Sequence, residues 1–233
     1  MKIKHIEKTT LLDYPGKIAC TIFFYGCSFR CGFCYNPSLV LKEETPDLEE
    51  QTVLDFLEKR KNILEGVCFT GGEPLMTITI DFLKKVRSLG YKIKIDTNGS
   101  FPEKLKEIIS LGLVDYIAMD IKASKERYHE IIGLNFPIEK IEESIKIISN
   151  FNEYEFRTTI VESIHTKSEI ENMFQWLKSL TNKKLQRHSL QGFKNTGSFV
   201  NNKFKQERNT TEKYLEELKL IAKKYTDIVN TKY

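Results

Sequence analysis

The chain has 233 residues, 40% of them apolar, and a formal net charge of +4. A chain of this length can bury a substantial core, so we expect a single domain over residues 1–233. Without a long block of like charge, a nucleic-acid partner is not expected. There is also no apolar run near the roughly 18 residues of a membrane helix and no signal-peptide pattern at the N-terminus. We therefore expect a cytoplasmic protein with no membrane or nucleic-acid partner.

Short β-branched or aromatic runs alternate along the chain with amphipathic stretches. The predicted strands cover 17–24, 66–70, 91–97, 114–122, 154–161 and 184–191. The predicted helices cover 47–63, 79–89, 102–111, 138–150, 168–180 and 211–225. This alternation predicts a parallel sheet with helices outside it, either an open doubly wound sheet or a barrel-like curl. In both cases the ligand site is expected where the strands end.

Five cysteines occur in the chain, and three of them lie within the stretch YGCSFRCGFCYNP at 25–37. An odd count with a local cluster is typical of a metal site in a reduced compartment. Cys20 and Cys68 lie instead in apolar, strand-like runs, where a cysteine usually behaves as a small buried apolar residue. We therefore expect both of these to be core residues.

The clustered cysteines, Cys27, Cys31 and Cys34, provide three thiolates but no fourth local ligand. Spacing alone leaves two possibilities open. One is a structural zinc site completed by a distant histidine, and the other is an iron–sulfur cluster with one iron left without a protein ligand. Gly26 and Gly32 would allow the loop to turn tightly around either centre.

The run C-x3-C-x-aromatic-C, with Phe33 as the aromatic residue, resembles the signature of radical S-adenosylmethionine (SAM) enzymes. The resemblance implies one [4Fe-4S] cluster held by the three cysteines. It also implies that the amino and carboxylate groups of SAM chelate the fourth iron. An iron without a protein ligand would thus receive the cofactor directly.

Further candidate residues follow the second and third predicted strands. Gly71, Gly72 and Glu73 form a GGE segment, which would be an ordinary turn in isolation. It resembles the second motif of the family, in which bare glycine backbone and a carboxylate meet the SAM ammonium group. Asp96, Thr97 and Asn98 would ordinarily form an Asx turn, but their segment resembles one that lies near SAM in activating enzymes for glycyl radical proteins.

The last three predicted strands supply the remaining candidates. Asp120 and Lys122 stand two residues apart on one face of an extended chain, which alone indicates no more than a strand-end ion pair. Their D-x-K pattern resembles pyruvate formate-lyase activating enzyme and makes them candidates for the cofactor site. Arg157 would be a cation for the SAM carboxylate. His188 and Gln191 are further cofactor-site candidates, although a lone histidine is more often structural.

The longer stretch TTLLDYPGKIACTIFFYGCSFRCGFCYNP resembles the long form of the anaerobic ribonucleoside-triphosphate reductase activating family. Tyr35 departs from that pattern, which usually has histidine after the last cysteine, although an aromatic contact with the cofactor could persist. The resemblance implies a partial (β/α)6 TIM-like barrel and an oxidoreductase that makes a glycyl radical in a partner enzyme. It also implies a flavodoxin- or ferredoxin-type electron donor.

Residues 192–209 are polar, basic and without periodicity, and we expect them to form a lid or a partner-docking loop. Two other functions stay open. One is a radical SAM enzyme acting on a small molecule, similar to 7-carboxy-7-deazaguanine synthase, which shares the partial barrel. The other is a zinc-stabilised binding module without chemistry.

Overall fold

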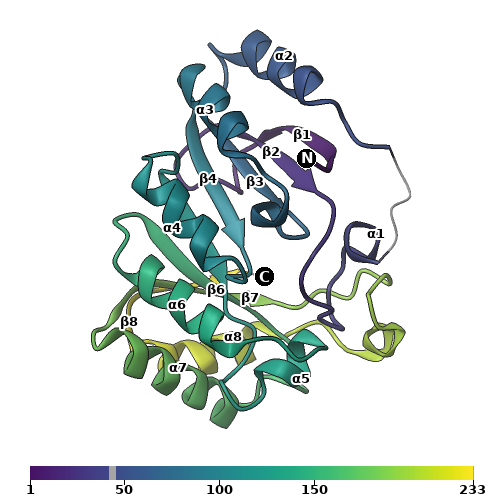
Figure 1. Ribbon diagram of the computed structural model, residues 1–233. Coiled ribbons are helices and arrows are strands. Elements are labelled where there is room, and N and C mark those ends of the chain that lie inside the picture. The colour runs from purple at the N-terminus through teal and green to yellow at the C-terminus, as the bar shows by residue number, and fades with distance from the viewer. Residues whose placement is uncertain (42–45, 233) are drawn as a thin grey trace. The chain divides into compact units, whose positions relative to one another are not determined.

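The computed structural model describes residues 1–41 and 46–232 (Figure 1). The chain divides into two compact units. Unit 1 comprises Met1–Ser28, Ser38–Thr97 and Phe101–Ile117, and unit 2 comprises Phe29–Pro37, Asn98–Ser100 and Ala118–Tyr233. Three of the unit boundaries fall inside sequence segments singled out above: the cluster loop, the TNG segment after the third predicted strand, and the fourth predicted strand.

Unit 1 contains the first four strands and three of the longer helices. The strands are β1 (Ile3–Thr10), β2 (Ala19–Phe24), β3 (Gly66–Gly71) and β4 (Lys92–Thr97). The helices are α2 (Glu50–Arg60), α3 (Ile80–Ser88) and α4 (Pro102–Ser110), and the 3-10 helix η1 covers Pro74–Met76. The short helix α1 (Pro37–Val40) and the strand β5 (Tyr116–Asp120) each run across a unit boundary.

Unit 2 contains β6 (Tyr154–Ile160), β7 (Leu185–Gly192) and β8 (Thr226–Lys232). Its helices are α5 (Tyr128–Ile132), α6 (Ile138–Ser149), α7 (Lys167–Thr181) and α8 (Glu212–Ala222), and the 3-10 helix η2 covers Asn202–Gln206. Gly133 ends α5 with a φ of 74°, a left-handed conformation that glycine adopts without a Cβ clash.

The strands follow one another as neighbours in chain order, from β1 to β8. β1 is antiparallel to β2, whereas β2–β3, β3–β4, β6–β7 and β7–β8 are parallel pairs. The six predicted strand–helix pairs are all present with ends shifted by a few residues. The fold is α/β with an open sheet, as a partial barrel requires.

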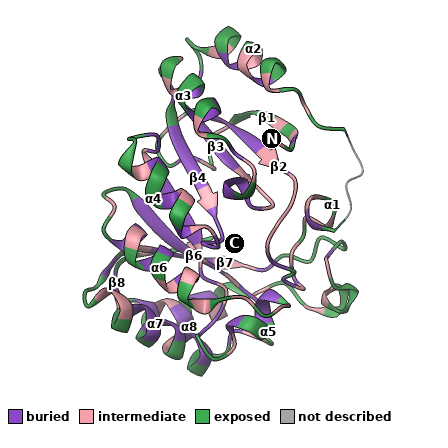
Figure 2. Ribbon diagram, viewed as in Figure 1, coloured by how far each residue is buried: buried purple, intermediate pink, exposed green. Residues whose placement is uncertain are grey.

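The core consists of strands that are buried on both faces. In β2, Ala19, Cys20 and Ile22 are fully buried, and Cys68 of β3 is as well, which confirms that Cys20 and Cys68 are core residues. Helices show one buried face and one exposed face, as Figure 2 shows for α3 and α4. Apolar residues at helical spacing, such as Phe82, Leu83 and Val86 of α3, form the buried faces.

Candidate functional site

The GGE turn at the end of β3 is joined to the chain just before the first clustered cysteine. The backbone amide of Gly72 donates to the carbonyl of Phe24 (2.8 Å), and the amide of Glu73 donates to that of Gly26 (2.7 Å). A Cβ atom on Gly72 would lie 2.0 Å from the Gly26 carbonyl oxygen. Gly71 has a φ of 113°, and its Cβ would lie 2.5 Å from backbone atoms of Phe24. Two glycines are therefore needed here, because no side chain fits between these backbones.

The third residue of that turn, Glu73, is fully buried. Its carboxylate accepts a hydrogen bond from the amide of Leu75 (3.1 Å), which caps η1, and another from the hydroxyl of Thr97 (2.9 Å). Buried polar groups that receive such bonds are held in one orientation. The structure thus brings Glu73 and Thr97, two of the predicted site residues, into direct contact at the ends of β3 and β4.

Asp96 belongs to a second polar cluster in unit 1. It receives a hydrogen bond from the Thr70 hydroxyl (3.4 Å) and forms an ion pair with Lys94. Lys94 is 1% exposed, lies 3.7 Å from the Cys68 sulfur and stands 5.9 Å from the centre of the Tyr116 ring. A buried ammonium group requires such partners, because burial of an unpaired charge is costly. Lys94 was not among the predicted site residues, because a lysine within a strand is usually expected to face solvent.

In unit 2, three predicted residues at the end of β5 and in the middle of β6 form one ion-pair cluster. Lys122 Nζ lies 3.0 Å from one oxygen of Asp120, and Arg157 Nε lies 2.9 Å from the other. All three side chains are partly buried. The amide of Ile121 donates to the carbonyl of Arg157 (2.7 Å), so the backbone joins the same two strands.

Charge compensation in this cluster is strong. Burial alone would raise the pKa of Asp120, but Arg157 and Lys122 outweigh burial and lower it to about 2. Burial alone would lower the pKa of Lys122, but the negative charge of Asp120 raises it above its usual range. Arg157 and Lys122 thus share the carboxylate of Asp120, which holds both cations beside it.

The part of the cluster loop in unit 2 is a tight turn. The amide of Cys34 donates to the carbonyl of Cys31 (3.1 Å), and the side chain of Phe33 is 5% exposed. Cys31 is buried, Cys34 is half-buried, and Tyr35 is 61% exposed. The Phe33 ring packs edge-on against His165, with centroids 6.2 Å apart. His165, which no sequence motif marked, donates from Nε2 to the Lys122 carbonyl (2.9 Å) and accepts at Nδ1 from the Val161 amide (3.0 Å).

The remaining three predicted site residues lie in unit 2 as well. Asn98 accepts the amide of Ser100 (2.9 Å) through its side chain, in the Asx-type turn that its sequence favours. His188 pairs in register with Phe156 and packs against Phe174 of α7, with ring centroids 4.8 Å apart. Gln191 pairs with Thr159 near the end of β7. Because side chains alternate along a strand, Gln191 shares a face with Arg157, whereas His188 lies on the opposite, helix-covered face.

Within 1–41 and 46–232, there is no group of three or more His, Cys, Asp or Glu side chains placed to hold a metal ion. In the same residues, none of the five cysteines is in a disulfide. None of the helices described is long and apolar enough to cross a membrane.

The chain is similar to known proteins in both sequence and structure. The radical SAM superfamily model matches residues 21–177. A Methanocaldococcus jannaschii protein named as a "putative glycyl-radical enzyme activating enzyme" is 31% identical over 97% of this chain and 94% of its own length. The pyruvate formate-lyase-activating enzyme of Clostridium pasteurianum is 35% identical over 52% of each chain. A solved domain of such an enzyme from Bacteroides vulgatus has a TM-score of 0.55 at 21% identity, covering 70% of this chain and 98% of that domain.

The chain therefore belongs to the radical SAM superfamily, in its glycyl-radical enzyme activating branch. The similarity to the Bacteroides vulgatus domain, at 21% identity, supports the fold alone. Membership implies SAM as cofactor and an iron–sulfur cluster.

Proposed function

We propose that this protein activates a glycyl radical enzyme by using SAM and one [4Fe-4S] cluster to remove a hydrogen atom from a glycine of that partner. The observation that carries the proposal is the similarity, over nearly the whole chain, to a protein named for that activity. When bound, the cluster held by this chain would supply the electron for the reductive cleavage of SAM, and SAM would be the source of the radical that takes the hydrogen atom.

We assign the cluster to Cys27, Cys31 and Cys34. The donor set fits, since iron–sulfur clusters are held by thiolates at short spacings. The loop is also tightly packed at its centre: a Cβ atom on Gly32 would lie 2.6 Å from the Phe204 ring, so only glycine fits this turn without moving its neighbour.

We assign SAM to residues of the cluster loop, of the strand ends and of the middle of β6. Glu73 is held by Thr97 and by the start of η1 in an orientation that lets it accept a bond from an ammonium group. Arg157 and Lys122 provide cations for a carboxylate. The assigned residues are Phe33, Tyr35, Gly71, Gly72, Glu73, Asp96, Thr97, Asn98, Asp120, Lys122, Arg157 and Gln191. His188, which faces α7, is given a packing role instead.

The partner we propose is anaerobic ribonucleoside-triphosphate reductase, with a flavodoxin- or ferredoxin-type protein as electron donor. Support for this partner comes from the LLDYPGK lead-in before the cluster loop. The test is electron paramagnetic resonance of the anaerobic reductase mixed with reconstituted protein, SAM and reductant. A glycine-centred doublet is expected, and it should disappear when the target glycine is replaced by alanine.

Pyruvate formate-lyase should be tested beside the reductase. A doublet on that enzyme alone would change the partner and keep the reaction. SAM cleavage coupled to turnover of a small molecule, with no doublet on either protein, would overturn the proposed function in favour of the small-molecule alternative.

A further inference from the structure

The segment between β7 and η2 is hydrogen-bonded to the cluster loop. Within unit 2, the amide of Val200 donates to the carbonyl of Cys34 (3.0 Å), and the amide of Asn201 donates to that of Gly32 (3.0 Å). One acceptor is the carbonyl of Cys34 itself, and the other is the carbonyl of Gly32, the residue after Cys31. We call residues 199–204 the brace. These bonds fix the backbone of the cluster loop on one side.

Aromatic packing reinforces the two hydrogen bonds. Phe204 packs edge-on against Phe33, with centroids 6.0 Å apart, and Phe33 also meets His165. Phe193 stacks on Phe199 at 5.1 Å and lies 6.5 Å from Phe204. The aromatic residue of the cysteine motif is thus enclosed between the brace and His165.

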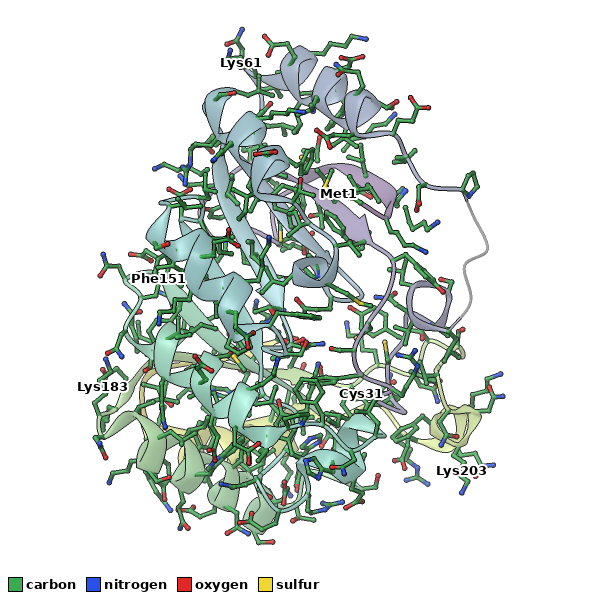
Figure 3. All side chains as sticks on the ribbon, in the orientation of Figure 1. Met1, Cys31, Lys61, Phe151, Lys183 and Lys203 are labelled. Carbon is green, nitrogen blue, oxygen red and sulfur yellow. The ribbon has the colours of Figure 1, made fainter. Side chains whose placement is uncertain are left out.

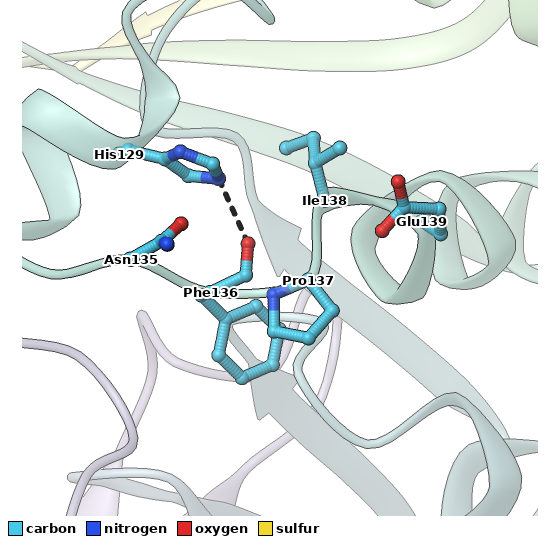
Figure 4. Close-up of a pocket in the computed structure, with 6 residues that line it drawn as sticks. All are labelled: His129, Asn135, Phe136, Pro137, Ile138 and Glu139. Atoms are coloured by element: carbon cyan, nitrogen blue, oxygen red, sulfur yellow. Dashed lines mark hydrogen bonds between the residues drawn. The ribbon is translucent and has the colours of Figure 1, made fainter.

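The other end of the same loop is anchored by α5 and the turn after it. The amide of Arg30 donates to the carbonyl of Ile132 (2.8 Å), and a Cβ on Gly133 would lie 2.5 Å from the Arg30 oxygen. Phe29 packs edge-on against Phe136 at 5.3 Å. Figure 4 shows the turn that carries Phe136, where His129 Nε2 bonds the Phe136 carbonyl (2.8 Å). Residues 29–34 are therefore held at both ends by residues of unit 2.

We propose that the brace sets the conformation of Gly32–Cys34 before any cluster is present, and that Phe204 is the positioning residue through which it retains the cluster. The part about cluster retention rests on the proposed function, whereas the part about loop conformation does not. The brace lies beyond residue 177, where the match to the superfamily model ends.

The physical reason is preorganisation. A loop that must order itself around a metal centre loses conformational entropy when the centre binds. If folding has already ordered the loop, binding does not bear that cost, and local opening, which would expose a thiolate to exchange, becomes rarer. The brace contacts the stretch of chain from Cys31 to Cys34. Ordering this stretch therefore fixes the backbone of two assigned cluster ligands together.

The test compares Phe204→Ala with Phe151→Ala. Both phenyl rings are half-buried and lie in unit 2, but Phe151 lies in the turn between α6 and β6, away from the cluster loop. The positions of Phe151 and of Cys31 in the cluster loop can be compared in Figure 3, where both are labelled. Hydrogen–deuterium exchange of the apo-protein should be about tenfold faster in the peptide covering 29–36 for Phe204→Ala, and unchanged for Phe151→Ala. After reconstitution, iron release to a chelator should be faster by a similar factor.

Phe204→Leu should restore most of the protection, because it keeps an apolar contact. If Phe204→Ala does not fold, Gly32→Ala provides the second variant: its methyl group would push Phe204 aside, and the same faster exchange is expected. Equal exchange in the Phe204 and Phe151 variants would overturn the brace. If exchange is faster in Phe204→Ala but the wild-type protein binds no iron on reconstitution, the result would support the role of the brace and contradict the proposed function.

Discussion

Glu73 shows how neighbouring residues hold the side chain of a proposed site residue in one position. Its carboxylate is fully buried and receives hydrogen bonds from Leu75 and Thr97. Hydrogen bonds to a charged carboxylate fix its direction. The GGE motif identified this residue from the sequence, but only the fold shows that Thr97 donates to it.

Replacing Glu73 with glutamine should weaken SAM binding at least about tenfold, because a charge-assisted bond to the ammonium group becomes a neutral one. Cluster content should not change, since Glu73 is not among the assigned iron ligands. Equilibrium binding of SAM to the reconstituted variant measures the effect, with iron content as the control. Unchanged affinity would remove Glu73 from the cofactor site.

The five cysteines should separate into two classes. Alanine at Cys27, Cys31 or Cys34 should abolish SAM cleavage and the cluster absorbance, because each change removes an iron ligand. Alanine at Cys20 or Cys68, both fully buried, should leave the cluster in place and lower the free energy of unfolding by about 1 kcal/mol. Iron and sulfide analysis after anaerobic reconstitution provides the measurement. Zinc in place of iron, or cluster loss in the Cys20 variant, would contradict the assignment.

At the scale of elements, the two faces of β7 make different contacts. Ser189 bonds Glu155 (2.7 Å) on the face shared with Arg157, whereas His188 is buried against α7. Thr158 donates to the Ile121 carbonyl (2.9 Å), so its oxygen accepts from His188 Nε2 (3.0 Å). In the part of the chain that the structure describes, His188 Nδ1 has no partner. A protonated ring would therefore bury an N–H without an acceptor.

This arrangement predicts a pH dependence of stability. Burial lowers the pKa of His188 to about 3, so the unfolded chain binds a proton that the folded chain does not between that value and the ordinary 6.5. The contribution of His188 is fully present above pH 6.5 and is lost as the pH falls toward 3, at up to about 1.4 kcal/mol per pH unit. Urea unfolding of wild type and His188→Leu from pH 7 to 4.5 should show the shallower slope in the variant. Parallel slopes would show that His188 does not titrate in this way.

At the scale of the whole molecule, the final third of the chain completes unit 2. β8 pairs with β7 from Leu185–Thr226 to Gln191–Lys232, and α8 adds Leu215 and Leu218 to the core. The two outer strands, β1 and β8, were absent from the predicted elements. Both carry charged or polar residues at most positions, so neither has the apolar run of a buried strand.

A chain shortened after Tyr225 should lose thermal stability by about 5–10 °C and associate in solution, because the paired edge of β7 would be exposed. A chain shortened after Asn230 keeps most of the β7–β8 pairs and is the matched control. Thermal melts and size-exclusion chromatography measure the two effects. A melt of the shorter chain that matches the control would show that β8 adds little to unit 2.

The sequence by itself determined the six strand–helix pairs, the cysteine motif and the ends of the strands where polar residues lie. Hydrophobic periodicity and motif spacing are local properties, so they can be read without coordinates. Only the tertiary structure decided that His188 faces α7, that Lys94 pairs with Asp96, and that residues 199–204 hold the cluster loop. The contacts of His188 with α7 and of residues 199–204 with the cluster loop join residues far apart in the chain. The side to which a strand residue such as Lys94 points depends on register, which packing fixes.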